Sequence, residues 1–349
     1  MRLFFHLIFF FCPLLSTAQF LIPVHPELEG EALLEALVDD FKTTVVLSSG
    51  DARDLMYSDI HNRNDTVYGV YSNHGIFLPQ GVDPSSFVFM DGDDDGINAE
   101  HVFPRSKGAD IGIANSDLHN LFPSRVLVNT NRGNFPFAEI NDTETELWYF
   151  EDDEMNAIPN NNIDDYSEGV RGMDGRFEPR ESRKGDIART MFYFYTMYRA
   201  QADAADPNFF DSQLSTLCSW HEQDPVDEEE YNRTFMIAEV QDGIPNPFIL
   251  DCSLVSRAYC QSENLECPII PTVSTTNLPN SIPYKFFPNP LDDTMYVEAR
   301  GVSQLLITDI QGRLWIRQEF DTRTTINTSI LPSGTYILII NEATFKLIK

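Results

Sequence analysis

Hydrophobic and polar positions follow different periods along the chain, and each period predicts a different element. Over residues 28–41, apolar residues recur three or four positions apart with acidic residues between them, which predicts an amphipathic helix. Over 185–200 the same spacing returns with large aromatic residues, which predicts the central core helix. Another helix is predicted around residues 231–240, with Pro245 and Pro247 ending it.

Other segments lack the helical period. From residue 67 to 89, short apolar and aromatic runs are broken by Asn, Gly and Pro, which predicts strands and turns. Residues 144–165 are acidic and rich in asparagine, which predicts a surface loop. Residues 100–137 have little periodicity but are dense in His, Asn, Arg and Gly, and such irregular segments often hold functional sites.

The pattern changes near the C-terminus. Residues 267–283 are rich in Pro, Thr, Ser and Asn, which is typical of a linker. Short β-type runs follow, separated by turn residues such as Gln311-Gly312 and Ser333-Gly334. We therefore predict a large α+β domain over residues 19–268, a linker over 269–284 and a small all-β sandwich over 285–349.

The first residues have the features of an export signal. Arg2 precedes an almost unbroken apolar run over residues 3–15, and small residues over 16–18 offer a cleavage site after Ala18. The run is shorter than the about 20 apolar residues that a membrane span needs. We predict a signal peptide over residues 1–18, with an uncleaved anchor as the alternative and no other membrane span.

Composition limits the partners of the chain. Its 54 acidic and 24 basic residues give a formal charge of −30, so the protein as a whole should repel polyanions. Any nucleic-acid chemistry would depend on local positive charge and metal ions. A hydrophobic content of 42% supplies a core and excludes a wholly disordered chain.

Four cysteines remain after the predicted cleavage. An even number in an exported protein predicts two disulfides, with three possible connectivities. A zinc site is the alternative, but no C-x-x-C pair or suitably spaced histidine supports it. The four are Cys218, Cys252, Cys260 and Cys267.

Three polar blocks lie close together in the irregular segment. They are Glu100-His101-Val102-Phe103-Pro104, Asp117-Leu118-His119-Asn120-Leu121-Phe122-Pro123, and the stretch from Asn129 to Phe137. Together they supply carboxylates, imidazoles, amides and guanidinium groups. Each block by itself is weak evidence for a function, but the joint occurrence of the three predicts a catalytic centre.

These blocks resemble the bacterial endonuclease I family, secreted or periplasmic nucleases of the His-Me finger (ββα-metal) superfamily. Later blocks resemble it in the same order, so the resemblance covers residues 40–252. It implies a ββα-metal finger core that cuts phosphodiester bonds. The later blocks are Phe177-Glu178-Pro179-Arg180, residues 184–189 with the aromatic helix after them, Trp220, Asp224-Pro225-Val226-Asp227, Asn232-Arg233 and residues 241–249.

The resemblance also implies residue roles. His101 matches the general base of the family, and an imidazole with an ordinary pKa near about 6.5 accepts protons around neutral pH. Glu100 and Asn134 match its ligands for one divalent cation, Mg²⁺ or another such as Mn²⁺ or Ca²⁺. Neighbouring side chains on a regular strand point to opposite faces. Glu100 and His101 therefore share a site only if the backbone is irregular or if they reach the phosphate from two sides.

The remaining polar residues near these blocks receive weaker assignments. We expect Asp117, His119 and Asn120 to support the metal-binding loop through hydrogen bonds. Trp220 and His221 could stack on a base, although a buried tryptophan is the more frequent explanation. Candidates to hold substrate phosphates, with ordinary ion pairs to Glu178 or Glu181 as the alternative, are Arg132, Arg180, Arg183 and Lys184.

The acidic turn Asp91-Gly92-Asp93-Asp94-Asp95-Gly96 begins like a calcium-binding loop. The twelfth position of that pattern is Val102 instead of the glutamate that would bind Ca²⁺ through both oxygens. We interpret the turn as a solvated acidic turn, with a partial Ca²⁺ site as the alternative.

The C-terminal residues resemble the sorting domain of type IX secretion in Bacteroidetes. The resemblance rests on Phe287-Pro288-Asn289-Pro290, Asp309-Ile310-Gln311-Gly312-Arg313, Ser333-Gly334-Thr335-Tyr336 and the basic end at Lys346 and Lys349. It implies recognition by the outer-membrane export machinery, and therefore a secreted or cell-surface protein. The alternative is a generic adhesion or carbohydrate-binding module.

Taken together, the sequence predicts a secreted metal-dependent endonuclease for DNA, RNA or both. The alternative is a catalytically decayed, surface-displayed binding or adhesion protein. A different hydrolase is disfavoured because the chain has no G-x-S-x-G elbow and no H-E-x-x-H zinc helix.

Overall fold

The computed structural model describes residues 24–261, 284–287, 291, 293–309, 313–340 and 343–349. The chain divides into two compact units, Met1–Pro271 and Thr272–Lys349, while the finer domain limits stay predictions. The predicted signal peptide, Cys267 and most of the predicted linker lie outside the described residues. Within the described part of the chain, no helix is long and apolar enough to cross a membrane.

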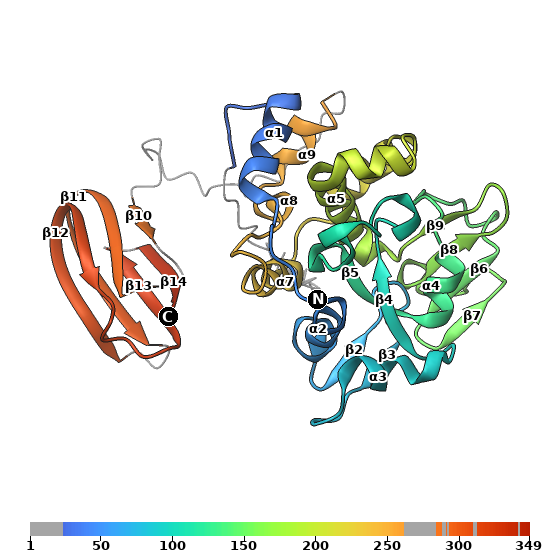
Figure 1. Cartoon of the computed structure of the whole chain (residues 1–349), viewed down its shortest axis with the longest axis horizontal. Coiled ribbons are helices and arrows are strands. Elements are labelled where there is room, and N and C mark those ends of the chain that lie inside the picture. Colours follow the sequence, from blue (N-terminus) through green and yellow to red (C-terminus); the bar gives the residue numbers. More distant parts are fainter. Residues whose placement is uncertain (1–23, 262–283, 288–290, 292, 310–312, 341–342) are drawn as a thin grey trace, which may run out of the picture. The chain divides into compact units, whose positions relative to one another are not determined.

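The first unit is built around a hairpin and the helix that follows it. Strand β4 (Ile97–His101) pairs antiparallel with β5 (Leu121–Arg125), and α4 (Val126–Arg132) begins directly after β5. Figure 1 shows β4, β5 and α4 in the part of the chain coloured green to teal. The succession is that of the predicted ββα finger. The irregular segment therefore contains two strands and a helix, which its low periodicity did not reveal.

A helical pair and a small sheet precede the finger. Helix α1 (Gly30–Phe41) confirms the predicted amphipathic helix and buries Leu33, Leu34 and Leu37. Helix α2 (Ser49–Leu55) continues into a π-helical turn over Met56–Ile60. An antiparallel meander follows, formed by β1 (Asn62–Arg63), β2 (Thr66–Tyr68) and β3 (Gly75–Phe77).

The strand prediction over residues 67–89 is wrong at its end, where α3 (Pro84–Phe89) forms. The side chain of Asp83 accepts a hydrogen bond from the backbone N of Ser86 (2.8 Å), and Pro84 occupies the first helical position. Both features favour the start of a helix.

The surface-loop prediction over residues 144–165 is also wrong. This segment contains β6 (Leu147–Phe150) and β7 (Asp153–Met155), which form a hairpin. They join β8 (Ser167–Val170) and β9 (Arg176–Glu178) in a sheet of order β7-β6-β8-β9. Apolar residues of β6 are buried, so a short hydrophobic run outweighs its acidic surroundings.

Helix α5 (Lys184–Ala205) is the central core helix that the sequence predicts, and its aromatic residues are almost all buried. It packs against α6 (Leu214–Gln223) and α1. Helix α7 (Glu228–Ala238) begins at Asp227, whose side chain accepts from the backbone N of Glu230 (2.8 Å). Three glutamates follow in its first turn, where the helix dipole favours negative charge.

Two short helices complete the first unit, α8 (Pro247–Leu250) and α9 (Ser253–Ala258). Pro247 therefore starts a helix where the sequence predicts the end of one. A proline at the first helical position loses no hydrogen bond, because that N–H has no partner within the helix.

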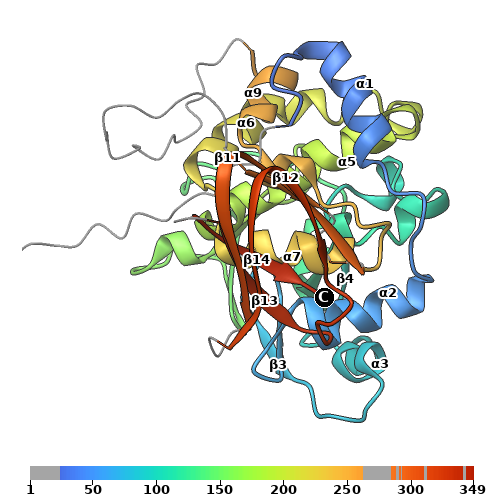
Figure 2. The same cartoon turned by 90° about the vertical axis from the view of Figure 1, so that its left-hand side faces the viewer.

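The second unit confirms the all-β prediction as one curled five-stranded sheet. The long strands β11 (Thr294–Asp309) and β12 (Leu314–Asn327) run side by side (Figures 1 and 2). The first half of β11 pairs with β10 (Tyr284–Phe287) and the second half with β13 (Thr335–Ile340). Strand β14 (Ala343–Ile348) pairs with β13. Because β11 is shared in this way, the sheet wraps around its own core.

The motif residues of this unit have structural explanations. The carboxylate of Asp309 accepts from the backbone N of Arg313 (2.9 Å) and from the indole N–H of Trp315 (3.1 Å), which closes the turn between β11 and β12. Gly334 exchanges two backbone hydrogen bonds with Lys349 (2.8 and 2.9 Å), so the basic end pairs with the Ser-Gly turn.

Candidate active site

Strand β4 carries Glu100 and His101 side by side at its end. The ladder to β5 is regular at both positions, with Glu100 opposite Phe122 and His101 opposite Leu121. The two side chains therefore lie on opposite faces of the strand. The sequence allows either an irregular backbone or an approach of the two side chains to a phosphate from two sides. The regular strand fits the second arrangement.

The imidazole of His101 is oriented by the loop between β4 and β5. Its Nε2 lies 3.0 Å from the carbonyl oxygen of Asn115 and must donate there, because a carbonyl only accepts. In the neutral ring the proton is then on Nε2, and Nδ1 carries a free lone pair. Burial, together with the cation of Arg105, lowers the pKa of His101 to about 4. The ring is therefore neutral at physiological pH and can accept a proton at Nδ1.

Glu100 points into the protein and is 3% exposed. Its Oε1 accepts from the hydroxyl of Tyr71 (2.7 Å) and lies 3.3 Å from Nη1 of Arg132. Burial raises the pKa of Glu100, while Arg132 and Tyr71 act in the opposite direction. Glu100 is therefore a carboxylate removed from water and held against the guanidinium of Arg132.

Arg132 differs from its predicted role in phosphate binding. Its side chain is fully buried and donates to the carbonyl oxygens of Val102 (2.7 Å) and Gly133 (3.2 Å). Its guanidinium also lies 4.6 Å from the ring centre of Phe137. Arg132 thus fixes Glu100 and the chain after His101, and it has no exposed surface for a substrate.

Asn134 lies beyond the end of α4, is exposed, and donates to the hydroxyl of Ser106 (3.0 Å). Asn129 lies within α4 and donates to the side chain of Asn98 on β4 (2.7 Å). Asn129 and Arg132 are three residues apart, so they share one face of α4, and Arg132 reaches Glu100. No role for Asn129 is predicted from the sequence, in which the three-residue spacing to Arg132 is the only indication.

Asp117, His119 and Asn120 are all buried in the 3-10 turn before β5. Asn120 accepts from the backbone N of Phe103 (2.8 Å) and donates to its carbonyl oxygen (3.1 Å), which fixes the chain two residues after His101. His119 packs its ring 4.8 Å from Tyr193 and donates from Nε2 to the carbonyl of Ile244 (3.1 Å). This placement is compatible with the predicted supporting role.

Lys184 is 1% exposed and has three carboxylates around its ammonium group. Nζ lies 2.7 Å from Glu178, 2.6 Å from Glu181 and 3.0 Å from Glu139. These glutamates are the one group of three or more potential metal ligands within the described ranges. Because Lys184 is buried and its three N–H donors point at these carboxylates, the ion-pair alternative fits Lys184 better than phosphate binding.

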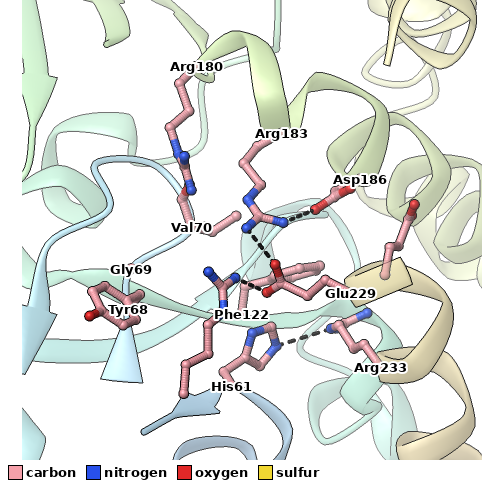
Figure 3. Close-up of a pocket in the computed structure, with 12 residues that line it drawn as sticks. His61, Tyr68, Gly69, Val70, Phe122, Arg180, Arg183, Asp186, Glu229 and Arg233 are labelled. Carbon is pink, nitrogen blue, oxygen red and sulfur yellow. Dashed lines mark hydrogen bonds and ion pairs between the residues drawn. The ribbon is translucent and has the colours of Figure 1, made fainter. Parts of the chain in front are cut away.

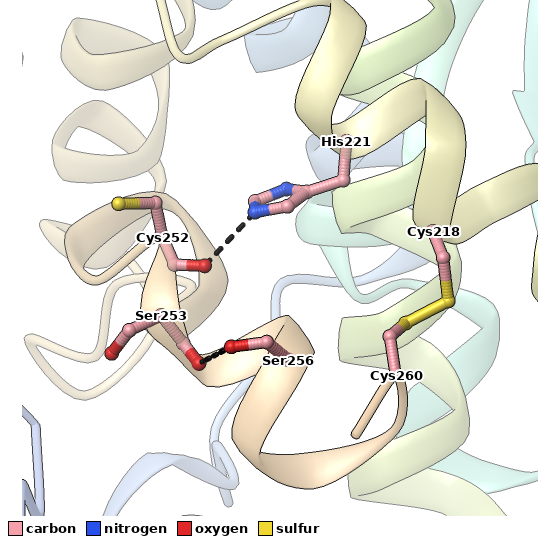
Figure 4. Close-up of a disulfide and its surroundings, with 6 residues drawn as sticks. All are labelled: Cys218, His221, Cys252, Ser253, Ser256 and Cys260. Carbon is pink, nitrogen blue, oxygen red and sulfur yellow. Dashed lines mark hydrogen bonds between the residues drawn. A yellow bond between two sulfur atoms is a disulfide. The ribbon is translucent and has the colours of Figure 1, made fainter. Parts of the chain in front are cut away.

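Trp220 and His221 are buried, so the structural explanation for them is correct. The indole N–H of Trp220 donates to Glu139 (2.7 Å). His221 lies against α9 and donates from Nε2 to the carbonyl of Cys252 (3.0 Å), as Figure 4 shows. Burial lowers the pKa of His221 to about 3.

The neutral state of His221 predicts a pH-dependent stability. The unfolded chain binds a proton below the ordinary histidine pKa of about 6.5, whereas the folded chain does not bind it until about pH 3. We expect the unfolding free energy to fall as pH drops below 6.5, by about 1.4 kcal/mol per pH unit for this group. Urea melts at pH 7, 6, 5 and 4 measure it, and His221→Gln should show a shallower decline. Equal slopes for the two proteins would contradict the assignment.

One predicted disulfide is present, between Cys218 and Cys260, whose Cα atoms are 6.2 Å apart (Figure 4). Cys252 is disulfide-bonded as well, and Cys267 lies outside the described residues. The acidic turn before β4 places Asp95 against Arg125 in an ion pair. The choice between a solvated turn and a partial Ca²⁺ site stays a prediction.

Arg180 and Arg183 line a pocket on the Glu100 side of the hairpin of β4 and β5. Arg180 donates to the carbonyl of Val70 (3.1 Å) and to the hydroxyl of Ser182 (3.1 Å). Arg183 donates to Asp186 (2.7 Å) and Glu229 (3.1 Å). Figure 3 shows both guanidinium groups pointing into this pocket. The structure thus places these two near open space and keeps Arg132 and Lys184 inside the protein.

A hairpin followed by a helix, with a neutral histidine and a buried carboxylate at the strand end, is the arrangement of a ββα-type nuclease site. The endonuclease I family model matches residues 48–252, which is more than half of the chain, and the chain belongs to that family. The model of a secretion system C-terminal sorting domain matches residues 285–349. This second match identifies the curled sheet as a type IX sorting domain, so the protein is secreted or displayed at the cell surface.

Two curated relatives are similar to the nuclease unit. An extracellular ribonuclease of Bacillus amyloliquefaciens is 33% identical over 165 residues, which cover 44% of this chain and 50% of the relative. An extracellular ribonuclease of Bacillus subtilis (strain 168) is 32% identical over the same shares. The chain therefore spans about half the length of these relatives.

Proposed function

We propose that this protein is a metal-dependent endonuclease that hydrolyses phosphodiester bonds in RNA and DNA with little sequence specificity. The observation that carries the proposal is the state of His101. Its ring is neutral and its Nε2 is fixed on the carbonyl of Asn115, so Nδ1 is available as a base. Its neighbour Glu100 is a buried carboxylate.

In this proposal His101 takes a proton from a water molecule at Nδ1 as that water attacks the phosphorus. The phosphorus–oxygen bond to the 3′-oxygen breaks, and the leaving oxygen takes a proton from solvent water. The products carry a 5′-phosphate and a 3′-hydroxyl. The imidazolium that forms keeps its Nε2–H on the Asn115 carbonyl, which stabilises the added charge. Asn120 and Arg132 hold the backbone directly after His101 in place.

A divalent cation fits this donor set. Tyr71 and Arg132 both contact Oε1 of Glu100, so Oε2 is the oxygen that Glu100 would offer to the ion. Asn134 is the second ligand that the sequence predicts, and Asn129 is the amide that faces β4. When bound, such a cation stabilises negative charge on the phosphate and on the leaving oxygen.

Replacing Glu100 tests this ligand assignment. We expect Glu100→Gln to require at least roughly tenfold more Mg²⁺ for half-maximal activity, because losing even an outer partner of a metal site has that effect. Magnesium titrations of the cleavage rate measure it, with circular dichroism to confirm folding. Comparing Asn129→Ala with Asn134→Ala identifies the second ligand. A Mg²⁺ requirement of Glu100→Gln equal to that of the wild type would remove Glu100 from the metal site.

The function itself is tested by incubating the purified full chain with plasmid DNA and with RNA, each with Mg²⁺ or with EDTA. We expect cleavage with Mg²⁺ and none with EDTA. Because the net charge is −30, raising the salt concentration should weaken binding less steeply than for a strongly basic nuclease. If both polymers remain intact with Mg²⁺ and Mn²⁺, the alternative of a decayed, surface-displayed binding protein holds.

The sorting domain adds one partner, the type IX export machinery, to the nucleic acid substrate. We propose that the signal peptide predicted over residues 1–18 takes the chain across the inner membrane before this step. The extracellular ribonucleases that the chain resembles favour RNA as one substrate. The proposal extends to DNA because attack by a water molecule does not use the 2′-hydroxyl.

A further inference from the structure

The pocket that holds Arg180 and Arg183 gathers positive charge in a protein whose formal net charge is −30. Arg63 on β1 and Arg233 on α7 complete a set of four guanidinium groups in its lining, and His61 lies beside them. Figure 3 shows Arg180 and Arg183 entering from one side, with Glu229 and His61 facing them. These cations come from separate elements of the fold that meet here.

Three carboxylates also line the pocket. One of them pairs with an arginine outside the lining, and a second pairs with Arg183. Glu230 is buried and accepts three hydrogen bonds from Arg189 (2.6–2.9 Å). Asp186 accepts from Arg183 (2.7 Å) and lies 3.6 Å from Arg189. Glu229 is therefore the only lining carboxylate, among the described residues, that is left for the remaining pocket cations.

Glu229 forms ion pairs with two arginines of the pocket at once, Arg63 and Arg183, the latter at 3.1 Å. Its side chain is 38% exposed, so the carboxylate can leave without breaking the core. Arg180 bonds only to neutral oxygens, and within the described ranges no carboxylate lies within ion-pair distance of it. The Nε of Arg183 is buried without a partner. The pocket thus has more donors than Glu229 satisfies.

The pocket arginines differ in their electrostatic surroundings. Burial acts to lower the pKa of Arg183, but the carboxylates of Asp186, Asp227 and Asp224 raise it overall. Burial and the neighbouring Arg183 lower the pKa of Arg180 to about 10. Burial also lowers the pKa of Arg233 to about 10, although nearby carboxylates act in the opposite direction. An anion entering the pocket would stabilise Arg180, whose hydrogen-bond partners are neutral oxygens.

The pocket is connected directly to the catalytic strand. Val70 in its lining precedes Tyr71, whose hydroxyl bonds to Glu100 (2.7 Å). Phe122 in its lining is the cross-strand partner of Glu100. A group bound in the pocket therefore lies on the Glu100 side of the hairpin, whereas His101 lies on the other.

We propose that Arg63, Arg180 and Arg183 bind a backbone phosphate that flanks the cleaved bond, and that Glu229 occupies this place until nucleic acid displaces it. A phosphate presents more acceptor oxygens than a carboxylate, and arginine matches its geometry with paired donors. Glu229 then competes with a ligand for Arg63 and Arg183, so anions with fewer phosphates bind more weakly. The proposal rests on the nucleic-acid substrate proposed above.

Binding measured without cleavage tests the role of Glu229. Fluorescence anisotropy in EDTA would follow a labelled RNA oligonucleotide without terminal phosphates. We expect Glu229→Gln to bind roughly three- to tenfold more tightly, because two ion pairs no longer have to be broken. Glu228→Gln is the matched control, since it removes the same charge from an exposed neighbour in α7. Binding by Glu229→Gln that is equal to or weaker than that of Glu228→Gln would overturn the proposal.

A second variant keeps the proposal testable if Glu229→Gln folds poorly. We expect Arg180→Gln to weaken binding and to reduce the slope of log affinity against log salt by about 1, the value for one lost phosphate contact. Arg171→Gln, at an exposed arginine paired with Glu154, should keep the wild-type slope. An unchanged slope for Arg180→Gln contradicts phosphate binding in this pocket.

The source of the phosphate is distinguished by competition. Inorganic phosphate should compete weakly, whereas an oligonucleotide with internal phosphates should compete fully. Equal competition per phosphate group would replace the flanking-phosphate assignment with a site for free phosphate. Cleavage in Mg²⁺ is measured separately, so a failure of this proposal differs from a failure of the proposed function.

Discussion

His101→Ala is expected to lower kcat/KM for nucleic-acid cleavage by about 100- to 10,000-fold, the contribution of a positioned general base. The substitution removes Nδ1, the only lone pair on this ring that the Asn115 carbonyl leaves free. The wild-type ring is already neutral at physiological pH. Raising the pH to 8 should therefore leave the difference in rate between the wild type and the variant unchanged. The carboxylate of Glu100 stays on Tyr71 and Arg132 in the variant.

Single-turnover cleavage at saturating Mg²⁺ measures this effect, with thermal melting to show that the variant folds. His25→Ala is the matched control, because it removes a partly exposed imidazole from the N-terminal segment of the same unit. That control should cleave at the wild-type rate. Cleavage by His101→Ala within about threefold of the wild type would remove His101 as the base, because general-base loss is far larger.

Asp117→Ala is expected to destabilise the nuclease unit by at least about 4 kcal/mol, since it leaves four buried donors unpaired and each costs about 1–3 kcal/mol. Asp117 is fully buried, and its carboxylate accepts four hydrogen bonds. Two come from the hydroxyls of Tyr193 (2.9 Å) and Tyr198 (2.7 Å). The others come from the side chain of Gln241 (2.9 Å) and the backbone N of His119 (3.0 Å).

Urea denaturation at pH 7 measures the loss. Asp117→Asn should be less destabilised than Asp117→Ala, because its amide oxygen still accepts from two of the donors. Asp164→Ala, at an exposed aspartate in the nuclease unit, controls for the removal of one charge. A stability of Asp117→Ala equal to that of the Asp164→Ala control would show that this network contributes nothing.

Elements with a strong period could be predicted from the sequence, and elements set by distant contacts could not. The aromatic spacing of α5 is visible along the chain because every turn of that helix meets the core. Strand β6 has only a short apolar run between acidic residues, and its partner β8 supplies the reason that it is a strand. Helix α3 depends on the cap at Asp83, a local feature that the turn pattern concealed.

The candidate site divides in the same way. The residue types around His101 and Glu100 are readable in the sequence, and the family model covers the segment that contains them. The charge of a side chain does not reveal where it points, however. The sequence leaves both phosphate binding and ion pairing open for Arg132 and Lys184, and the fold buries both in ion pairs. The pairing of Arg63 with Glu229 joins residues far apart in the chain, and only the fold brings them into one pocket.

The central claim is that His101 activates a water molecule in a metal-dependent cleavage, and the chemistry of the product ends tests it most directly. A short RNA and a DNA of matched sequence would be digested in Mg²⁺ and in EDTA, and the fragments identified by mass spectrometry. The proposed mechanism predicts 5′-phosphate and 3′-hydroxyl ends from both polymers, in Mg²⁺ alone. A 2′,3′-cyclic phosphate on the RNA fragments, or equal cleavage in EDTA, would contradict it.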